Sequence, residues 1–340
     1  MERVRLGRTN LQVTRTAFGV LPLQRVGMDE AVRILRRAYE AGINFYDTAR
    51  AYSDSEEKIG RALGRVRDKI IISTKTVATD RNGVLGDLET SLRKLRTDYV
   101  DILQLHNPAQ LPDPGDPNSS YAGLVSAREK GMVRHLGITN HRRDLALRAV
   151  ESGLFDTIQF PLCMISVDED LALAAACSKS DLGMIAMKGL AGGLITNARA
   201  AFAFMRSLPG VVPIWGFQRM GELAEFIDLD ADPPALDDDL KSAIENDRRE
   251  LAADFCRACG YCLPCPAEIP IPMAARMRLC LRRMPHEQFL TKEWQEKMGR
   301  IRNCTKCRQC AERCPYGLDT PALLETMLED YENFLRAHSA

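Results

Sequence analysis

Between residues 14 and 228, short β-branched runs alternate with amphipathic helical stretches. Two of the helical stretches, 29–42 and 85–97, place apolar residues at a three-to-four spacing. Eight strand–helix units in series predict a parallel sheet, and eight is the number that closes a TIM barrel. The predicted strands are TAFGV (16–20), INFYDT (43–48), KIIISTK (69–75), YVDILQLH (99–106), RHLGITN (134–140), TIQFPL (157–162), GMIAMKG (183–189) and VVPIWG (211–216).

The segments before and after this alternation do not continue the strand–helix pattern. RVRLGRTNLQVT (3–14) predicts a β-hairpin that turns at Arg8–Asn10, which we expect at the floor of the barrel. The acidic, Pro-interrupted segment 228–240 suits a linker. We therefore expect an α/β chain of two domains, the (β/α)8 TIM barrel in 1–230 and a linker with a mostly helical domain in 231–340. The helices expected there are 273–284, 290–303 and 320–335.

Composition excludes several classes of protein. The 340 residues carry a net charge of zero, so nothing favours a nucleic acid or an anionic membrane surface. No apolar stretch approaches the ~20 residues that a membrane span needs, and the charged N-terminus lacks the apolar run of a signal peptide. Eleven cysteines in a chain of this length do not indicate a secreted disulfide scaffold. We expect a cytoplasmic protein.

Polar side chains follow three successive predicted strands. Asp47, Lys75 and His106 stand at these strand ends, and Tyr52 lies in the loop after Asp47. In a TIM barrel the active site forms at the carboxyl ends of the strands. A lysine beside a tyrosine favours the phenolate and lowers the tyrosine pKa, and a neighbouring histidine can orient a carbonyl oxygen. Each residue alone is typical of a cap, a packed ring or a surface charge, but together they predict carbonyl reduction.

Over residues 1–228 the sequence resembles the aldo-keto reductase superfamily. The motifs that carry the resemblance are LGRTNLQVT (6–14), INFYDTARAYSDSEEKIGRAL (43–63), STK (73–75), LETSLRKLRTDYVDILQLH (88–106), GITN (137–140) and MKGLAGGL (187–194). The resemblance implies that Tyr52 is the general acid, that Lys75 and Asp47 tune it, and that His106 orients the carbonyl.

The same resemblance implies a nicotinamide cofactor, NADPH with NADH as the alternative. Asn140 and Gln159 match positions that hold the nicotinamide carboxamide, and Met187 stands where many members stack an aromatic ring. Arg219 is the candidate for the 2′-phosphate, although a plain surface charge is the other interpretation. The other implied contacts lie in the pyrophosphate loop and the adenosine-side loop: Lys188, Gly189, Leu190, Gly192, Gly193, Gly216, Gln218 and Glu222, the last where glutamine is usual.

Eight of the cysteines fall in two runs. CTKCRQCAERCP (304–315) has the C-x2-C-x2-C-x3-C-P spacing of the bacterial ferredoxin run and predicts a 4Fe–4S cluster. CRACGYCLPCP (256–266) has a last gap one residue shorter, so a zinc site is the alternative there. By analogy with two-cluster ferredoxins, the fourth cysteine of each run ligates the other cluster. The implied ligand sets are Cys256, Cys259, Cys262 and Cys314 on one cluster, and Cys304, Cys307, Cys310 and Cys265 on the other.

These patterns predict an NAD(P)H-dependent reductase of a small aldehyde or ketone, in which the (β/α)8 TIM barrel is followed by a mostly helical ferredoxin-like iron–sulfur domain with two clusters. A hydride carries two electrons and each cluster carries one, so the clusters serve electron transfer through a flavoprotein or ferredoxin partner, docking or redox sensing. The alternative is an iron–sulfur electron-transfer or sensing protein whose barrel mainly binds nucleotide. The complete Asp47, Tyr52, Lys75 and His106 set favours the reductase.

Overall fold

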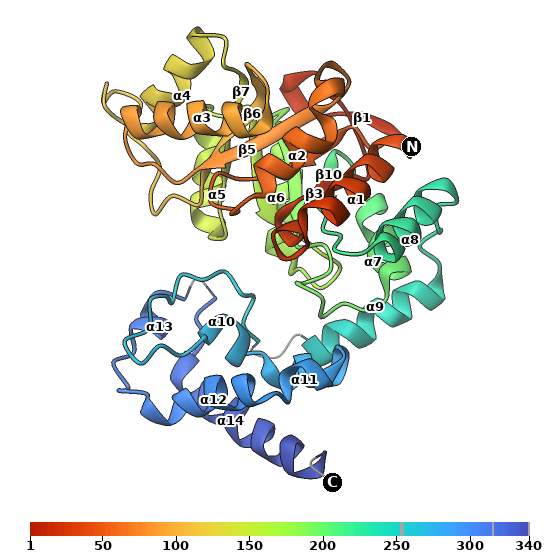
Figure 1. Cartoon of the computed structure of the whole chain (residues 1–340), viewed down its shortest axis with the longest axis vertical. Helices are drawn as coiled ribbons and strands as arrows, with labels where there is room; N and C mark the ends of the chain where they lie inside the picture. Colours follow the sequence, from red (N-terminus) through yellow and green to blue (C-terminus); the bar gives the residue numbers. More distant parts are fainter. Residues whose placement is uncertain (252–254, 315, 339–340) are drawn as a thin grey trace. The chain divides into compact units, whose positions relative to one another are not determined.

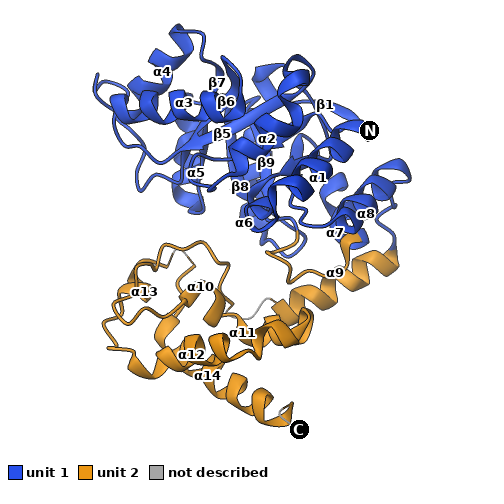
Figure 2. Ribbon diagram, in the orientation of Figure 1, with its two compact units in different colours: residues 1–189, 199–237 blue, residues 190–198, 238–340 orange. Residues whose placement is uncertain are grey.

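The computed structural model describes residues 1–251, 255–314 and 316–338. The chain forms two compact units (Figure 2). The barrel unit comprises 1–189 and 199–237, and the cysteine unit comprises 190–198 together with the described residues from 238 onward. The expected domain boundary at residue 230 stays a prediction. Among the described residues, no helix is long and apolar enough to cross a bilayer.

Eight parallel strands close the barrel, as the alternation predicted (Figure 1). Each strand pairs with its successor in the chain, and the last pairs with the first, in the order β10-β3-β4-β5-β6-β7-β8-β9. The strands are β3 (Ala17–Gly19), β4 (Phe45–Asp47), β5 (Ile71–Thr76), β6 (Val100–His106), β7 (Val133–Thr139), β8 (Thr157–Pro161), β9 (Gly183–Met187) and β10 (Val211–Trp215). Six of the predicted runs contain their strand whole, and β5 and β7 each extend one residue beyond the predicted run.

Amphipathic helices surround the barrel because each buries one apolar stripe. In α1 the buried residues Ala31, Ile34, Leu35 and Ala38 recur at helical spacing. Burial of one such leucine side chain contributes about 1.5–3 kcal/mol. The helices are α1 (Met28–Glu40), α2 (Ser55–Leu63), α3 (Arg81–Leu95), α4 (Ser120–Glu129), α5 (Arg143–Ser152), α6 (Asp168–Lys179), α7 (Ala198–Ser207) and α8 (Met220–Ala231), with 3-10 turns η2 (Leu21–Arg25) and η3 (Gly64–Lys69).

A β-hairpin lies at the amino ends of the barrel strands. Its strands β1 (Arg3–Arg5) and β2 (Gln12–Thr14) are joined through the 3-10 turn η1 (Gly7–Thr9). Leu6 and Val13 are fully buried in one cluster with barrel residues of β3, β4, β6 and β9. A Cβ on Gly7 would lie 2.3 Å from the backbone nitrogen of Gly183, the first residue of β9. The expected hairpin at the barrel floor is therefore confirmed.

The cysteine unit is helical in its described part. Its helices are α9 (Asp238–Leu251), α10 (Ile271–Ala274), α11 (Met277–Arg283), α12 (Lys292–Gly299), α13 (Gln309–Glu312) and α14 (Thr320–Ala337), with 3-10 turns η4 (His286–Phe289) and η5 (Arg300–Asn303). Helices α10, α11, α12 and α13 contact α14. Tyr331 of α14 is buried and donates a hydrogen bond of 2.7 Å to the carbonyl of Phe289. This packing brings together helices on both sides of the second cysteine run.

Candidate functional sites

Three adjacent strand ends of the barrel bring the predicted catalytic side chains together. Asp47 ends β4, Lys75 is the penultimate residue of β5, and His106 ends β6. Lys75 Nζ donates a hydrogen bond of 2.5 Å to Asp47 Oδ2 and one of 2.7 Å to the Thr48 carbonyl. Lys75 is 1% exposed and Asp47 2%, so this ion pair is held away from water.

The Asp47 carboxylate is fixed by two further amides. Gln104 Nε2 lies 3.2 Å from Asp47 Oδ1, and Gln159 Nε2 lies 3.4 Å from Asp47 Oδ2. Burial raises the pKa of the Asp47 carboxyl, and the Lys75 ammonium acts in the opposite direction. A buried ion pair with several hydrogen bonds has a defined geometry, because each lost partner would leave an uncompensated charge.

Tyr52 lies over this pair. Lys75 Nζ is 5.2 Å from the centroid of the Tyr52 ring, and the His106 ring meets the Tyr52 ring edge-on at 5.6 Å. Burial raises the pKa of the Tyr52 phenol, the Lys75 ammonium lowers it, and the Asp47 carboxylate raises it. The expected effect of Lys75 therefore has the right sign, but burial is the larger effect. Tyr52 keeps its proton at neutral pH and is available as a proton donor.

His106 is the fourth member of the site. Burial, and then the nearby Lys75 charge, lower the pKa of His106 to about 3, so its imidazole is neutral at physiological pH. Its Nδ1 atom is buried and has no hydrogen-bond partner among the described residues. A neutral imidazole has one N–H donor, which can bind an uncharged carbonyl oxygen.

The two predicted carboxamide-binding residues occupy neighbouring positions at the ends of β7 and β8. The Asn140 backbone N–H donates to the Gln159 carbonyl at 3.1 Å, and both side chains are 1% exposed. Asn140 Nδ2 donates to the Pro108 carbonyl at 3.0 Å. Gln159 Oε1 accepts from Gln104 Nε2 at 2.8 Å. Each amide nitrogen carries two hydrogens, so both side chains retain capacity for a ligand.

The glycine-rich segment after β9 contains several left-handed residues. Lys188, Ala191, Gly192 and Gly193 all have positive φ, and the Gly193 N–H closes a turn on the Leu190 carbonyl at 2.8 Å. Gly189 has a different constraint, because a Cβ there would lie 2.5 Å from the Trp215 ring. Residues 188–189 cluster with the barrel unit, whereas 190–198 cluster with the cysteine unit.

The remaining predicted nucleotide contacts precede α8. Glu222, in the first turn of α8, accepts hydrogen bonds from the Gln218 N–H at 2.7 Å and the Arg219 N–H at 3.2 Å. Its carboxylate thus caps the positive end of the helix dipole. The Arg219 side chain is exposed. A Cβ on Gly216 would lie 2.7 Å from Pro22 Cγ, so this glycine also permits close packing.

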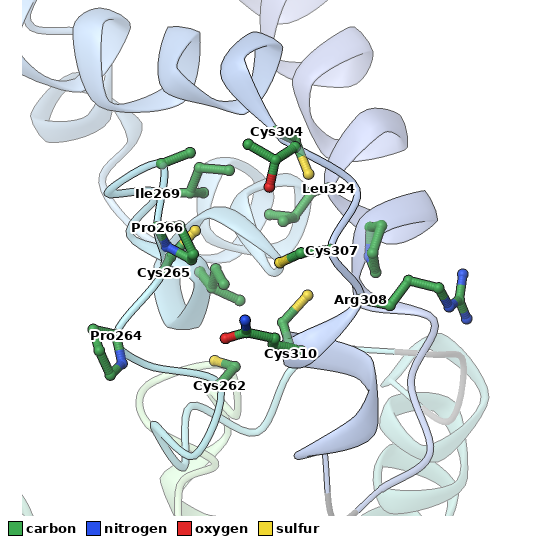
Figure 3. Close-up of a pocket in the computed structure, with 15 residues that line it drawn as sticks. Cys262, Pro264, Cys265, Pro266, Ile269, Cys304, Cys307, Arg308, Cys310 and Leu324 are labelled. Atoms are coloured by element: carbon green, nitrogen blue, oxygen red, sulfur yellow. The ribbon is translucent and has the colours of Figure 1, made fainter.

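The eight run cysteines line two hollows within the cysteine unit. The first hollow is lined by Cys262 and Cys265 from the first run and by three cysteines of the second (Figure 3). The second is lined by Cys310 and Cys314 from the second run and by three cysteines of the first. The three second-run cysteines of the first hollow are Cys304, Cys307 and Cys310, and the three first-run cysteines of the second are Cys256, Cys259 and Cys262. Each hollow therefore contains one of the predicted cross-paired sets, and Cys262 and Cys310 line both hollows, so the pairing stays a prediction.

Both runs have the same backbone conformation at matching positions. A left-handed residue stands before the second cysteine, after it, and three residues past the fourth; these are Ala258, Gly260 and Glu268 in the first run and Lys306, Arg308 and Gly317 in the second. Helices α10 and α14 each begin six residues past the fourth cysteine and carry proline in the first turn. When left-handed residues alternate with residues of ordinary backbone conformation, successive backbone N–H groups turn toward one point. Such an arrangement suits an anionic iron–sulfur cluster.

The spacing of the thiols bears on the zinc alternative. Among residues 1–251, 255–314 and 316–338, no three His, Cys, Asp or Glu side chains converge closely enough to hold a single metal ion. A tetrahedral zinc site needs thiolates at ~2.3 Å from one ion, whereas a cubic cluster holds its four thiolates at separate irons. The cysteine linings of the two hollows offer the separate thiolates that a cluster needs.

Comparison with known protein families agrees with this geometry. Residues 15–206, more than half of the chain, match the aldo/keto reductase family. The chain belongs to that family. Residues 255–319 of this aldo/keto reductase match the 4Fe-4S dicluster domain family, which supports the fused architecture.

Individual relatives cover parts of this aldo/keto reductase. L-galactose dehydrogenase of Arabidopsis thaliana is 30% identical over 214 residues, which are 56% of this chain and 66% of the relative. Methylglyoxal reductase DkgA of Yersinia pestis is 33% identical over 144 residues, or 41% of this chain and 50% of the relative. The chain thus spans half to two thirds of the length of these curated relatives.

Solved structures show the same fold as this reductase. An aldo-keto reductase from Bacillus halodurans in its holo form has a TM-score of 0.62 at 20% identity and covers 73% of this chain and 96% of its own. A Bombyx mori aldo-keto reductase in complex with NADP has a TM-score of 0.59 at 20% identity, with 72% and 92% covered. At this identity the likeness concerns the fold.

Two features of the reductase were missed by sequence reasoning. Gln104 contacts Asp47 and Gln159, and it donates to Ser73 Oγ at 2.8 Å; its signal was a polar residue within the apolar run YVDILQLH. His141 directly follows GITN, and burial lowers its pKa to about 3, with Lys188 and His106 acting in the same direction. Both lie beside predicted site residues.

Proposed function

We propose that this protein is a cytoplasmic NADPH-dependent reductase that converts a small aldehyde or ketone to the alcohol. The observation that carries the proposal is the buried Asp47–Lys75 ion pair beneath the protonated Tyr52 phenol, beside a neutral His106. Two of the relatives described above are named L-galactose dehydrogenase and methylglyoxal reductase, and these names support a small carbonyl substrate. The cytoplasm suits cysteines arranged for clusters rather than disulfides.

The side chains have complementary roles in this reaction. A bound nicotinamide supplies the hydride that adds to the carbonyl carbon. Tyr52 donates its phenolic proton to the carbonyl oxygen as negative charge develops there, which completes the alcohol. The Lys75 ammonium stabilises the resulting phenolate until water returns the proton, and Asp47 holds Lys75 in place. The neutral His106 donates a hydrogen bond to the same oxygen and orients the carbonyl.

Several residues would hold the nucleotide. Asn140 and Gln159 are buried, adjacent amides that can pair with the donor and acceptor of a carboxamide. The glycine-rich segment from Lys188 to Gly193 supplies turned backbone near the pyrophosphate, with Leu190 at its bend. On the adenosine side, Gly216 and Gln218 lead to Arg219, whose exposed guanidinium suits the 2′-phosphate of NADPH, and Glu222 orders this turn.

We also propose two 4Fe–4S clusters, ligated by the cross-paired cysteines of the two hollows. Bound clusters supply one-electron transfer. Because a hydride carries two electrons, we infer that the clusters exchange electrons with a flavoprotein or ferredoxin rather than with the nicotinamide. Cys307 is exposed, so we infer that a redox partner approaches the hollow that Cys307 lines.

Anaerobically purified protein tests this function. Iron and sulfide are counted, and NADPH oxidation is then followed with a panel of small aldehydes and ketones, using NADPH deuterated at the transferable position. We expect deuterium in the alcohol product and no bleaching of the cluster absorbance by NADPH alone. NADPH binding without any carbonyl reduction would favour the electron-transfer alternative, and bleaching by NADPH alone would overturn the need for a mediator.

A further inference from the structure

The glycine-rich segment 190–198 is held by the cysteine unit. It clusters with the residues from 238 onward although it directly follows β9 and Gly189 of the barrel unit (Figure 2). Arg276 donates a hydrogen bond of 3.0 Å to the Gly192 carbonyl. Arg283 donates one of 2.9 Å to the Leu194 carbonyl. Two arginines at the two ends of α11 thus bind two carbonyls of one short loop.

Both arginines are themselves fixed. Arg276 is 5% exposed, stands at the N-cap of α11 and lies beside the buried Cys280 side chain. Arg283 pairs with Asp247 at 2.8 Å and with Glu250, both on α9. Guanidinium groups that are buried or paired on one side lose little further freedom when they bind a carbonyl on the other.

Two of the loop residues that contact α11 and its C-cap are glycines. A Cβ on Gly192 would lie 2.9 Å from an Arg276 nitrogen, and a Cβ on Gly193 would lie 2.7 Å from Met284 Cε. Both glycines also have left-handed φ, of 67° and 91°. The contacts with Arg276 and Met284 therefore explain the absence of side chains at these two positions.

We propose that Arg276 and Arg283 are positioning residues for the nucleotide: from the iron–sulfur unit they fix the backbone of the loop that receives the pyrophosphate. The proposal rests on the nucleotide role that the proposed function gives this loop. Glycine loses more conformational freedom on ordering than any other residue. A loop already ordered by α11 does not incur that cost when the nucleotide binds, so affinity rises through preorganisation.

The order of segment 190–198 then depends on α11 and its neighbours in the cysteine unit. Arg276 follows α10 by two residues, and α10 begins six residues past Cys265, a predicted cluster ligand. Any coupling between two bound groups is reciprocal in free energy. The arrangement thus links nucleotide affinity to the integrity of the iron–sulfur unit without requiring electron transfer between them.

Nucleotide binding by the cluster-loaded protein tests this proposal. We would compare Arg276→Gln and Arg283→Ala with Arg282→Ala, a control on the same helix whose guanidinium pairs with Asp330 at 2.7 Å and 2.8 Å. The dissociation constant of NADPH is read from the change in nicotinamide fluorescence, alongside KM, kcat and iron content. We expect the dissociation constant to rise about tenfold in both loop variants, with kcat at saturation within about twofold of wild type and Arg282→Ala unchanged.

The outcomes separate the two proposals. If the wild type binds NADPH and both loop variants bind it within about twofold, the positioning role is wrong. If the wild type does not bind NADPH, the proposed function itself fails. Should Arg276→Gln lose its iron, Arg283→Ala decides, because its side chain contacts the loop and α9 rather than the cysteine runs.

Discussion

The barrel site and the cysteine centre are built in opposite ways. In the barrel site the functional side chains bind one another, since Asp47 is held by Lys75, Gln104 and Gln159. In the cysteine centre the thiols line hollows, and most are half-buried or exposed. The first site is preorganised by protein hydrogen bonds, and the second is completed by the group it binds. A substitution should therefore disturb chemistry in the barrel and assembly in the cysteine centre.

The largest effect is expected from Tyr52→Phe. The change removes the proton donor but leaves the ring that packs on His106 and Lys75. We expect kcat for carbonyl reduction to fall by about 10²–10⁴-fold, while the dissociation constant of NADPH stays unchanged. Tyr39→Phe, on the outer helix α1, is the matched control and should keep full activity. Unchanged turnover in Tyr52→Phe would refute the catalytic assignment.

The second effect concerns the pairing of cysteines across the two runs. Cys265→Ser should remove about half of the iron, because this residue shares a hollow with Cys304. The double variant with Cys304→Ser should then lose no more iron than either single change. The double variant of Cys265→Ser with Cys256→Ser should lose both clusters, because Cys256 lines the other hollow. The reverse pattern in the two double variants would indicate pairing within each run.

The third effect is the pH dependence of the barrel reaction. With a pKa of about 3, His106 stays neutral throughout the physiological range and contributes no inflection there. Tyr52, with its pKa raised by burial, keeps its proton past the ordinary value of about 10. We expect kcat to be flat from about pH 5 to 8 and to decline only on the alkaline side. His106→Gln should keep that shape, and an acid limb near neutrality in the wild type alone would mean that an imidazolium takes part.

The two regions also differ in how much of them the sequence could predict. Strand ends are local features, so Asp47, Lys75 and His106 could be located from the alternation of runs and the rule that active sites lie at carboxyl ends. Cysteine spacing is local too and predicted the clusters, whereas the cross-paired ligand sets were predicted by analogy with two-cluster ferredoxins. The left-handed backbone positions that recur in the two cysteine runs could not be predicted from the sequence, because alanine, lysine and arginine occupy them as well as glycine.

Contacts between segments that are far apart in the chain could not be predicted from the sequence. The glycines of the loop after β9 suggested approach of a ligand, but Gly189 accommodates Trp215 and Gly192 accommodates Arg276. Gln104 looked like an exception within an apolar strand until its partners Asp47 and Gln159 were placed around it. In each case the partner is far away in the chain, and no local pattern encodes the pairing.

The smallest effect is expected at the start of α8, where protein hydrogen bonds and ligand binding compete. The Glu222 carboxylate accepts hydrogen bonds from the backbone N–H groups of Gln218 and Arg219, so a negative charge lies next to the backbone of the residue proposed for the 2′-phosphate. Glu222→Gln should raise NADPH affinity about threefold to tenfold relative to NADH, because a charge repelling the phosphate is removed. Arg219→Ala should lower NADPH affinity and leave NADH binding unchanged. Glu225→Gln, one turn later and exposed, removes the same charge without touching these amides, and equal changes for both nucleotides in Glu222→Gln would contradict the 2′-phosphate assignment.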